Sequence, residues 1–213
     1  MDIIILGANN PQTLRLINDI NNSSPKEKIN ILGWVDNDEK KIGQNIFGFE
    51  VLGTPDILTD SKYSSSFLVN NITRDGIVRK LTTEQLFKYN LPFISLVHPS
   101  VNIENVKVGK GVIVHEGVII EDSCIIDDYV AIAAKTSIAH ESYIGKYSFL
   151  ATNVTTAGLV SIGEATTIWT SATITPRIKI GDRVKVGAGS VVLNDVEPDK
   201  TIFGNPARIL ITK

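Results

Sequence analysis

The residues best suited to chemistry are a histidine and the acid that follows it, His140 and Glu141, in a chain of 213 residues with three histidines. An imidazole can take up a proton near neutral pH because its ordinary pKa is about 6.5. An adjacent carboxylate can orient the ring and stabilise its protonated form. The pair is therefore a candidate general base. The residues alone leave one alternative open, an exposed turn histidine without a chemical role.

The other candidate groups are interpreted as structural. His98 precedes Pro99 at an expected domain junction, and His115 is interpreted as a turn residue. The single cysteine, Cys124, excludes an internal disulfide and a zinc site made of several cysteines. We expect its side chain to point inward and pack in the core rather than act as a nucleophile. No metal site is predicted.

Composition limits the partners and the compartment. Lysine and arginine number 21 against 23 acidic residues, which gives a formal net charge of −2 with the charges interspersed. Without a basic stripe, a nucleic-acid partner is not expected. No segment approaches the roughly 20 apolar residues that span a bilayer, so no membrane partner is expected. The stretch MDIIILGANN is unlike a signal peptide, and we expect a cytoplasmic protein.

Aliphatic side chains recur at every sixth position in the second half of the chain. From Val108 to Val192, fourteen of the fifteen positions are aliphatic, and Thr156 is the exception. The fourth residue after each is small or β-branched over most of this stretch. Six residues supply only a short strand and a turn, so such units bury apolar surface only by stacking. The period therefore predicts a stacked repeat protein.

These repeats resemble those of the hexapeptide-repeat proteins, whose fold is a left-handed parallel β-helix with three repeats in each triangular coil. The resemblance implies about five coils over residues 98–196. Residues 18 positions apart then share a place in the coil, so His140 shares an outward-facing corner with Asp122 and Gly158. Residues 197–213 lack the period, and their Gly-x-Pro-Ala pattern resembles the closing segment of hexapeptide acyltransferases. We expect this segment to cover the open end of the coils.

The first half of the chain alternates between strand-like and helix-like runs. Strands are expected at 3–7, 29–38, 47–53, 66–70 and 92–97, and helices at 11–20 and 75–90. Helical spacing predicts that Ile77, Leu81 and Leu86 face inward. Residues 1–97 are therefore expected to form a small α/β domain with a Rossmann-like start and a parallel sheet.

Polar and small residues follow three of these strands, where an α/β sheet binds ligands. LGANNPQT, residues 6–13, lies at the first strand-to-helix turn, where backbone N–H groups can hold a phosphate. A carboxylate at the end of the second strand can accept hydrogen bonds from a ribose or a base. The candidate substrate-binding residues are Gly7, Ala8, Asn9, Asn10, Asp36, Asn37, Asn70 and Asn71.

AHESYIG, residues 139–145, looks like the His-(Asp/Glu)-x-x-Ile-Gly motif of the NeuD/PglD-type bacterial sugar acyltransferases. GWVDND and GFEVLGTPDIL also resemble the N-terminal domain of that family, so the resemblance covers nearly the whole chain. It implies that His140 acts as general base and that Glu141 orients it. It also implies direct attack on acetyl-CoA and a homotrimer with active sites between subunits. The implied acetyl-CoA contacts are Phe149, Gly158, Thr170 and Ala188.

The sequence departs from the family at two places. Phe149 stands where many relatives have a histidine, and Asn9, Asn10 and Pro11 replace (Ser/Gly)-Gly-His. Asparagine tolerates the left-handed conformations that glycine adopts, so the turn can persist. Phe149 and Trp169 are expected to be exposed at turns, which is the one feature of the sequence itself that favours trimerisation.

The leading hypothesis is an acetyl-CoA-dependent N-acetyltransferase that acts on a nucleotide-linked 4-amino sugar, for surface glycans such as lipopolysaccharide. O-acetylation of sialic acid or another sugar is the enzymatic alternative, and a non-catalytic sugar-nucleotide-binding scaffold is the other. A γ-type carbonic anhydrase is excluded because the histidines lie 17 and 25 residues apart, at different turn positions. The nucleotide base, the sugar and the choice between amine and hydroxyl acceptors stay open.

Overall fold

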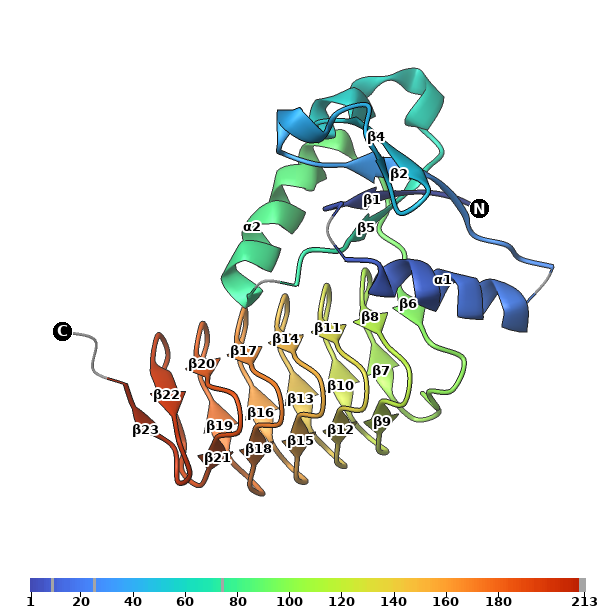
Figure 1. Cartoon of the computed structure of the whole chain (residues 1–213). Coiled ribbons are helices and arrows are strands. Elements are labelled where there is room, and N and C mark those ends of the chain that lie inside the picture. The colour runs from blue at the N-terminus through green and yellow to red at the C-terminus, as the bar shows by residue number, and fades with distance from the viewer. Residues whose placement is uncertain (9, 25, 74, 211–213) are drawn as a thin grey trace.

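The computed structural model describes residues 1–8, 10–24, 26–73 and 75–210. A row of stacked coils carries a small α/β domain on one of its faces (Figure 1). The structure confirms the predicted fold class, an N-terminal Rossmann-like domain and a left-handed parallel β-helix. The site is positioned by the contact between these two parts.

The N-terminal sheet has the strand order β3-β4-β2-β1-β5. Its strands are β1 (Asp2–Leu6), β2 (Asn30–Val35), β3 (Asn45–Ile46), β4 (Phe49–Gly53) and β5 (Phe67–Asn70). All pair in parallel except β3, which is antiparallel to β4. The chain proceeds from β1 to β2 on one side and returns to β5 on the other. The carboxyl ends of β1 and β5 therefore flank the switch point at which such sheets bind ligands.

Two α-helices and four short 3₁₀ helices complete this domain. They are α1 (Gln12–Ser23), α2 (Gly76–Leu86), η1 (Glu39–Lys41), η2 (Pro55–Thr59), η3 (Ser61–Tyr63) and η4 (Phe87–Tyr89). The prediction that Leu81 faces inward on α2 is wrong, because Leu81 is 61% exposed. Arg79 is completely buried on this helix instead. The buried face of α2 rests on the backbone of the β-helix, which offers carbonyl groups for a guanidinium to meet.

Arg79 joins the two parts of the molecule. Its Nε donates a hydrogen bond to the carbonyl of Tyr129 in the β-helix, and its Nη1 donates to the carbonyl of Asn70. Burial lowers the pKa of Arg79 to about 9, which leaves it protonated at neutral pH. The backbone N–H of Gly76 also donates to Oγ1 of Thr167, 2.8 Å away. These contacts hold α2 against the coils.

Fifteen two-residue strands, β7 to β21, occupy residues 107–192 and form three parallel sheets with their neighbours. The domain-facing sheet contains β6 (Leu96–Val97), β8 (Ile113–Val114), β11 (Ala131–Ile132), β14 (Phe149–Leu150), β17 (Thr167–Ile168), β20 (Lys185–Val186), β22 (Thr201–Phe203) and β23 (Arg208–Ile209). The second sheet contains β9 (Ile119–Ile120), β12 (Ser137–Ile138), β15 (Thr155–Thr156), β18 (Thr173–Ile174) and β21 (Val191–Val192). The third contains β7 (Lys107–Val108), β10 (Ile125–Ile126), β13 (Tyr143–Ile144), β16 (Ser161–Ile162) and β19 (Lys179–Ile180).

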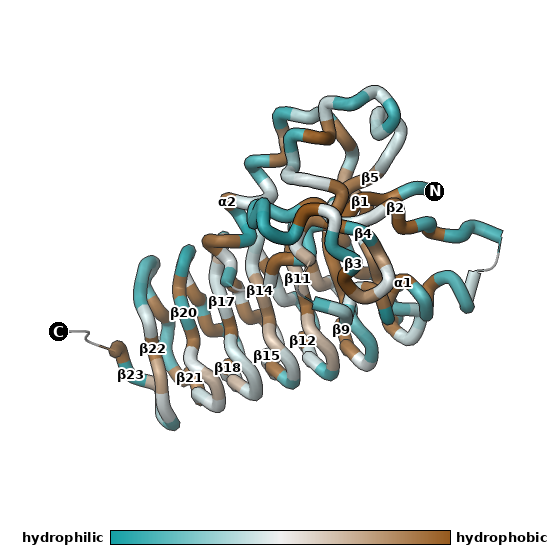
Figure 2. The backbone as a smooth tube through the Cα atoms, turned by 45° about the horizontal axis from the view of Figure 1, so that its top comes forward, coloured by the Kyte–Doolittle hydropathy of each residue, from teal (hydrophilic) through white to brown (hydrophobic). Residues whose placement is uncertain are grey.

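The register of the strands confirms the 18-residue coil. Ser137 pairs with Thr155, and Ile138 pairs with Thr156, each 18 positions on. The second residue of each of these fifteen strands contributes to one continuous interior column, so hydrophobic segments recur from coil to coil (Figure 2). Cys124 is buried in that column as expected. Stacking equivalent side chains is what removes their apolar surface from water.

Hydroxyl groups at the corners tie successive coils together. Oγ1 of Thr166 donates to the carbonyl of Gly181 at 2.7 Å and accepts from the N–H of Val184 at 3.1 Å. Ser148 makes the same two bonds with the next coil. Where the residue four positions after an aliphatic carries a hydroxyl, as at Ser148 and Thr166, it satisfies backbone groups that the turns leave unpaired.

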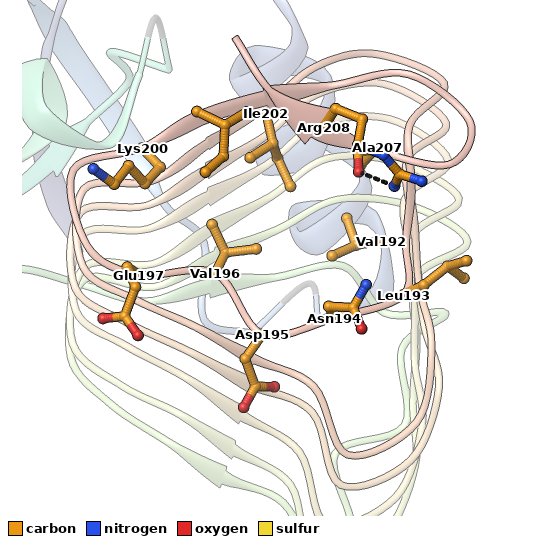
Figure 3. Close-up of a pocket in the computed structure, with 11 residues that line it drawn as sticks. Val192, Leu193, Asn194, Asp195, Val196, Glu197, Lys200, Ile202, Ala207 and Arg208 are labelled. Atoms are coloured by element: carbon orange, nitrogen blue, oxygen red, sulfur yellow. Dashed lines mark hydrogen bonds between the residues drawn. The ribbon is translucent and has the colours of Figure 1, made fainter. Parts of the chain in front are cut away.

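The two ends of the β-helix differ from the expected boundaries in detail. Leu96–Val97, assigned to the first domain from sequence, pairs with β8 and begins the domain-facing sheet. The closing segment extends this same sheet through β22 and β23, and Ile202 caps the interior column. A cavity of about 540 Å³ stays open at this end beside Val192 and Val196 (Figure 3). The closing segment therefore covers one side of the open end of the coils, because β22 and β23 extend the domain-facing sheet rather than pass across the interior column.

Thr156 gives a direct test of the interior column. Its hydroxyl is buried among aliphatic side chains and has no hydrogen-bond partner within the described residues. Thr156→Val is therefore expected to raise the free energy of unfolding by about 1–3 kcal/mol, measured from denaturant midpoints. Thr166→Val is the matched control and should lower it by a similar amount, because it removes two hydrogen bonds. Destabilisation by both substitutions would contradict this account.

Candidate active site

His140 lies on the corner between β12 and β13, with about half of its side chain exposed. Its Nδ1 is 3.2 Å from Oε1 of Glu141. A proton held on Nδ1 by this carboxylate leaves the lone pair of Nε2 available to accept another. The structure thus places the two predicted side chains in contact on one corner, and the role of His140 as general base stays a prediction.

Two backbone features make this corner possible. Glu141 adopts a left-handed conformation with a φ of 57°, as one residue does in each turn of the coil. The imidazole lies directly over Gly158 in the next coil, where a Cβ atom would stand 2.5 Å from Nε2. Glycine is thus required at 158 for the ring to lie there. The predicted shared corner of His140 and Gly158 is confirmed.

The other expected acetyl-CoA contacts lie elsewhere on the coil. Thr170 and Ala188 are exposed and occupy equivalent places on the corner that follows the domain-facing sheet. The N–H of Gly189 donates to the carbonyl of Thr170 at 2.9 Å, which ties the two coils together there. One side of the triangle separates this corner from His140, so a single chain does not bring the predicted cofactor residues together.

Phe149 does not lie at an exposed turn, so that expectation is wrong for it, whereas Trp169 follows β17 at a corner and is half-buried. Phe149 lies on β14, is 8% exposed and packs with core residues of the N-terminal domain. Its ring stands edge-on to Trp169, with ring centroids 6.0 Å apart and planes at 84°. Both side chains point out of the coil, but the N-terminal domain covers that face, which the period does not reveal.

A cavity of about 200 Å³ lies between the N-terminal domain and the domain-facing sheet, and we call it the interdomain cleft. Asn10, Gln12 and Thr73 line it from the carboxyl ends of β1 and β5. The residues that line it from the β-helix are His115, Ala131, Ile132, Ala133, Phe149, Ala151, Thr152, Trp169 and Thr170. The cleft therefore coincides with the switch point of the α/β sheet.

The shape of the interdomain cleft follows from the 18-residue period. His115, Ala133, Ala151 and Trp169 occupy equivalent places in four successive coils. Two large side chains thus enclose two alanines, which leaves a hollow with an apolar floor. His115 was interpreted from sequence as a turn residue, yet it is buried here. The 18-residue spacing between His115 and Ala133, which places His115 in one column with other cleft residues, is the sequence signal that could have identified it.

Asp36 holds the first strand-to-helix turn. Its Oδ2 accepts from the N–H of Ala8 at 3.0 Å and lies 2.8 Å from Nζ of Lys41. Its Oδ1 accepts from the N–H of Asp38. Burial raises the pKa of this carboxyl, but the bonds to Lys41, Asp38 and Ala8 outweigh it and hold the pKa below its ordinary value. Both oxygens thus have partners within the chain, which favours a positioning role.

Asn71 and Asn70 are likewise buried and hydrogen-bonded within the chain. The amide of Asn71 donates to the carbonyls of Gly7 and Asn10 and accepts from the hydroxyl of Thr13. Asn70 bonds to hydroxyl groups of α2 and to the N–H of residue 72. These amides fix the loop that borders the cleft, and direct contact with a substrate stays a prediction.

The remaining candidates differ in their access to the cleft. Asn10 lines it, and its Oδ1 accepts from the N–H of Gln12. Asn37 is exposed and exchanges hydrogen bonds with Gln85. Asn9 lies outside the described residues.

Two further findings concern metal and membrane. In the part of the chain that the structure describes, no group of three or more histidine, cysteine, aspartate or glutamate side chains is arranged to hold a metal ion. None of the helices in these same ranges is both long enough and apolar enough to cross a membrane.

Comparison with known proteins agrees with this architecture. Residues 160–194 match the family model described as bacterial transferase hexapeptide (six repeats). PerB from Caulobacter crescentus, in complex with CoA and GDP-perosamine, is 25% identical with a TM-score of 0.86, covering 99% of this chain and 97% of that chain. No curated protein matches at the level of sequence.

Two other solved structures are similar over their whole length. The acetyltransferase domain of PglB from Neisseria gonorrhoeae, in complex with acetyl coenzyme A, is 21% identical with a TM-score of 0.85 and 98% of both chains covered. WeeI from Acinetobacter baumannii is 22% identical with a TM-score of 0.83, covering 99% of this chain and 100% of that chain. The expected resemblance is confirmed at the level of the fold: residues 160–194 match the hexapeptide transferase model, and the whole chain has the architecture of PerB.

Asn71 tests the structure of the cleft border. Asn71→Ala leaves two carbonyls and the hydroxyl of Thr13 without their partner, so we expect a loss of about 1–3 kcal/mol in the free energy of unfolding. Hydrogen exchange should also become faster in residues 7–13. Asn37→Ala is the control, because this exposed amide should change the stability by less than about 0.5 kcal/mol. Equal effects of the two substitutions would contradict the positioning role.

Proposed function

We propose that the protein is an acetyl-CoA-dependent N-acetyltransferase that acts on a nucleotide-linked 4-amino sugar. The observation that carries the proposal is the His140–Glu141 pair, oriented on an exposed corner of a β-helix. The whole-chain similarity to an N-acetyltransferase solved with CoA and GDP-perosamine supports the substrate class. We assign the reaction to the cytoplasm and to the synthesis of surface glycans such as lipopolysaccharide.

His140 acts as the general base in this proposal. As the sugar amine attacks the carbonyl carbon of the acetyl thioester, Nε2 of His140 takes the proton that the amine loses. Glu141 stabilises the imidazolium through Nδ1. The C–S bond then breaks, and the imidazolium returns the proton to the departing thiolate. No acyl-enzyme is needed, because the thioester is already activated.

The corner that carries Thr170 and Ala188 suits the co-substrate. Acetyl-CoA is long, and these small, exposed residues repeat along the axis of the β-helix. Their size permits close approach to backbone groups. Gly158 supports the histidine on its own corner, whereas Phe149 lines the interdomain cleft on the sugar side.

The nucleotide sugar is assigned to the interdomain cleft. Asn10 borders it, and the turn at Gly7 and Ala8 lies at the switch point of the sheet, where α/β sheets bind ligands. In our proposal Asp36, Asn70 and Asn71 shape this turn. We keep Asn37 as a proposed substrate contact, and the prediction for Asn9 lies outside the described residues.

The separation of the two halves of the site favours an assembly. His140 lies one corner away from Thr170 and the cleft, so we propose a homotrimer whose three active sites lie between subunits. Each would combine the His140 corner of one copy with the cleft and the Thr170 corner of its neighbour. Closed cyclic symmetry gives every copy both roles.

Thiol release tests the activity. With acetyl-CoA and a panel of UDP-, GDP- and dTDP-linked 4-amino sugars, we expect turnover with at least one acceptor. His140→Ala should lower kcat by about 10²- to 10⁴-fold, the range of general-base catalysis. Glu141→Gln should lower it by less, because the base remains. His98→Gln is the matched histidine control.

The same panel separates the alternatives. Free sialic acid is included, and turnover with a hydroxyl acceptor alone would identify an O-acetyltransferase. Binding of nucleotide sugars by calorimetry without any thiol release would indicate a scaffold protein and contradict the proposal. Full activity of His140→Ala would contradict the role of the base.

Mixed oligomers test the shared site. His140→Ala removes the base, and Ala151→Phe fills the cleft from the domain-facing sheet. Each variant alone is expected to be inactive. Co-expressed copies should regain about a quarter of the wild-type activity. With equal amounts of the two variants, a site is intact when a copy with an intact His140 corner adjoins a copy with an intact cleft, and random mixing in a trimer produces this in about one site in four. No recovery, with the mass of a trimer measured by light scattering, would place the site within one chain.

A further inference from the structure

The interdomain cleft contains one ionisable side chain whose hydrogen-bonding capacity is unused. His115 is 5% exposed and lines the cavity. Within the described ranges, no hydrogen bond joins its ring nitrogens to another protein group, and these nitrogens are accessible from the cleft, because the fully buried atoms without a partner are Nη2 of Arg79 and Oγ1 of Thr156. The other histidines differ in this respect, since His98 contacts Ser100 and Asp19, and His140 contacts Glu141. A polar group that opens onto a cavity can bond to water or to a bound molecule, so the ring nitrogens of His115 are available to a ligand in the cleft.

The surroundings of His115 favour a neutral ring. Burial lowers its pKa, and the positive charges of Arg79 and His98 act in the same direction against the opposing effect of Glu116. A neutral imidazole offers one N–H donor and one acceptor nitrogen. A hydroxyl group has the same two capacities, whereas an unprotonated phosphate oxygen only accepts.

The floor of the cleft has the character of a sugar-ring site. Ala133 and Ala151 separate His115 from Trp169 along one column, over about 14 Å at roughly 4.8 Å per strand. An aromatic ring at one end, an apolar floor and a donor–acceptor group at the other end match a pyranose, which has apolar C–H faces and an equatorial rim of hydroxyls. The volume of about 200 Å³ is below that of a typical whole-ligand pocket, so one ring of a larger ligand fits there.

We propose that His115 is a specificity-determining residue that hydrogen-bonds a ring hydroxyl of the acceptor sugar, with the sugar seated between His115 and Trp169. The inference rests on the proposed function, because it assigns the sugar of the nucleotide-linked substrate to this hollow. It adds a recognition group that the His140 chemistry does not include. Ala133 and Ala151 set the room for the ring, so bulk at either position excludes it.

The test compares hydroxyls one at a time. Steady-state kinetics are measured with the accepted nucleotide sugar and with analogues that each lack one ring hydroxyl, for wild type and His115→Leu. The wild type should lose about 10- to 100-fold in kcat/KM for one analogue, because a buried hydrogen-bonding group is left unpaired. His115→Leu should lose a similar amount with the full substrate, and should not discriminate against that analogue.

Two companion variants separate recognition from folding. His115→Gln keeps a donor and an acceptor and should retain part of the discrimination, while His98→Gln should behave as wild type. The KM for acetyl-CoA is expected to stay unchanged throughout. If His115→Leu does not fold, the test uses His115→Gln, and its kcat/KM values across the analogue series are compared with those of the wild type.

The outcomes distinguish this inference from the proposed function. Turnover by His115→Leu with wild-type kcat/KM, or equal discrimination by both proteins, would overturn the role of His115 and leave the acetyltransferase intact. Absence of both binding and turnover for every nucleotide sugar would overturn the proposed function, and the inference with it. A loss confined to the KM for acetyl-CoA would also overturn it.

Discussion

The rest of the structure depends on one constraint: each inward side chain of the β-helix must stack on its equivalent 18 residues later. The pairing of Ile138 with Thr156 is one instance, and the strands from residue 107 to residue 192 follow the same register. An insertion within this stretch would shift every later outward residue around the triangle. The same register therefore places Gly158 under His140 and assembles the column from His115 to Trp169.

The second determinant is the attachment of the N-terminal domain to one face of the coils. Arg79 is buried without a carboxylate partner in the described chain; its Nε and Nη1 donate to backbone carbonyls from both parts of the molecule, and its Nη2 has no partner there. Breaking such a contact leaves an uncompensated charge, so the domain is expected to stay in place. Its position converts a flat sheet into a cleft, next to the loop that Asn71 holds.

The three histidines show how surroundings select a role. His140 is exposed and oriented by a carboxylate, which suits proton transfer. His115 is buried in the cleft without a partner in the described chain, which suits recognition. His98 is tied to Ser100 and Asp19 and joins the first coil to α1. The residue type is the same in each case, and the difference lies in access and in the neighbouring charges.

The sequence by itself determined the six-residue period and the α/β character of the first domain, because each depends on a local pattern, and the resemblance to hexapeptide-repeat proteins added the 18-residue coil that places His140 at a corner. Only the tertiary structure decided what covers the outward side chains. The period shows that Phe149 points out of the coil, but a distant domain buries it. Likewise, Leu81 is exposed although the helical spacing predicts that it faces inward, and Arg79 is buried instead because α2 rests on backbone carbonyls. Periodicity reports the direction of a side chain, whereas burial depends on segments far away in the sequence.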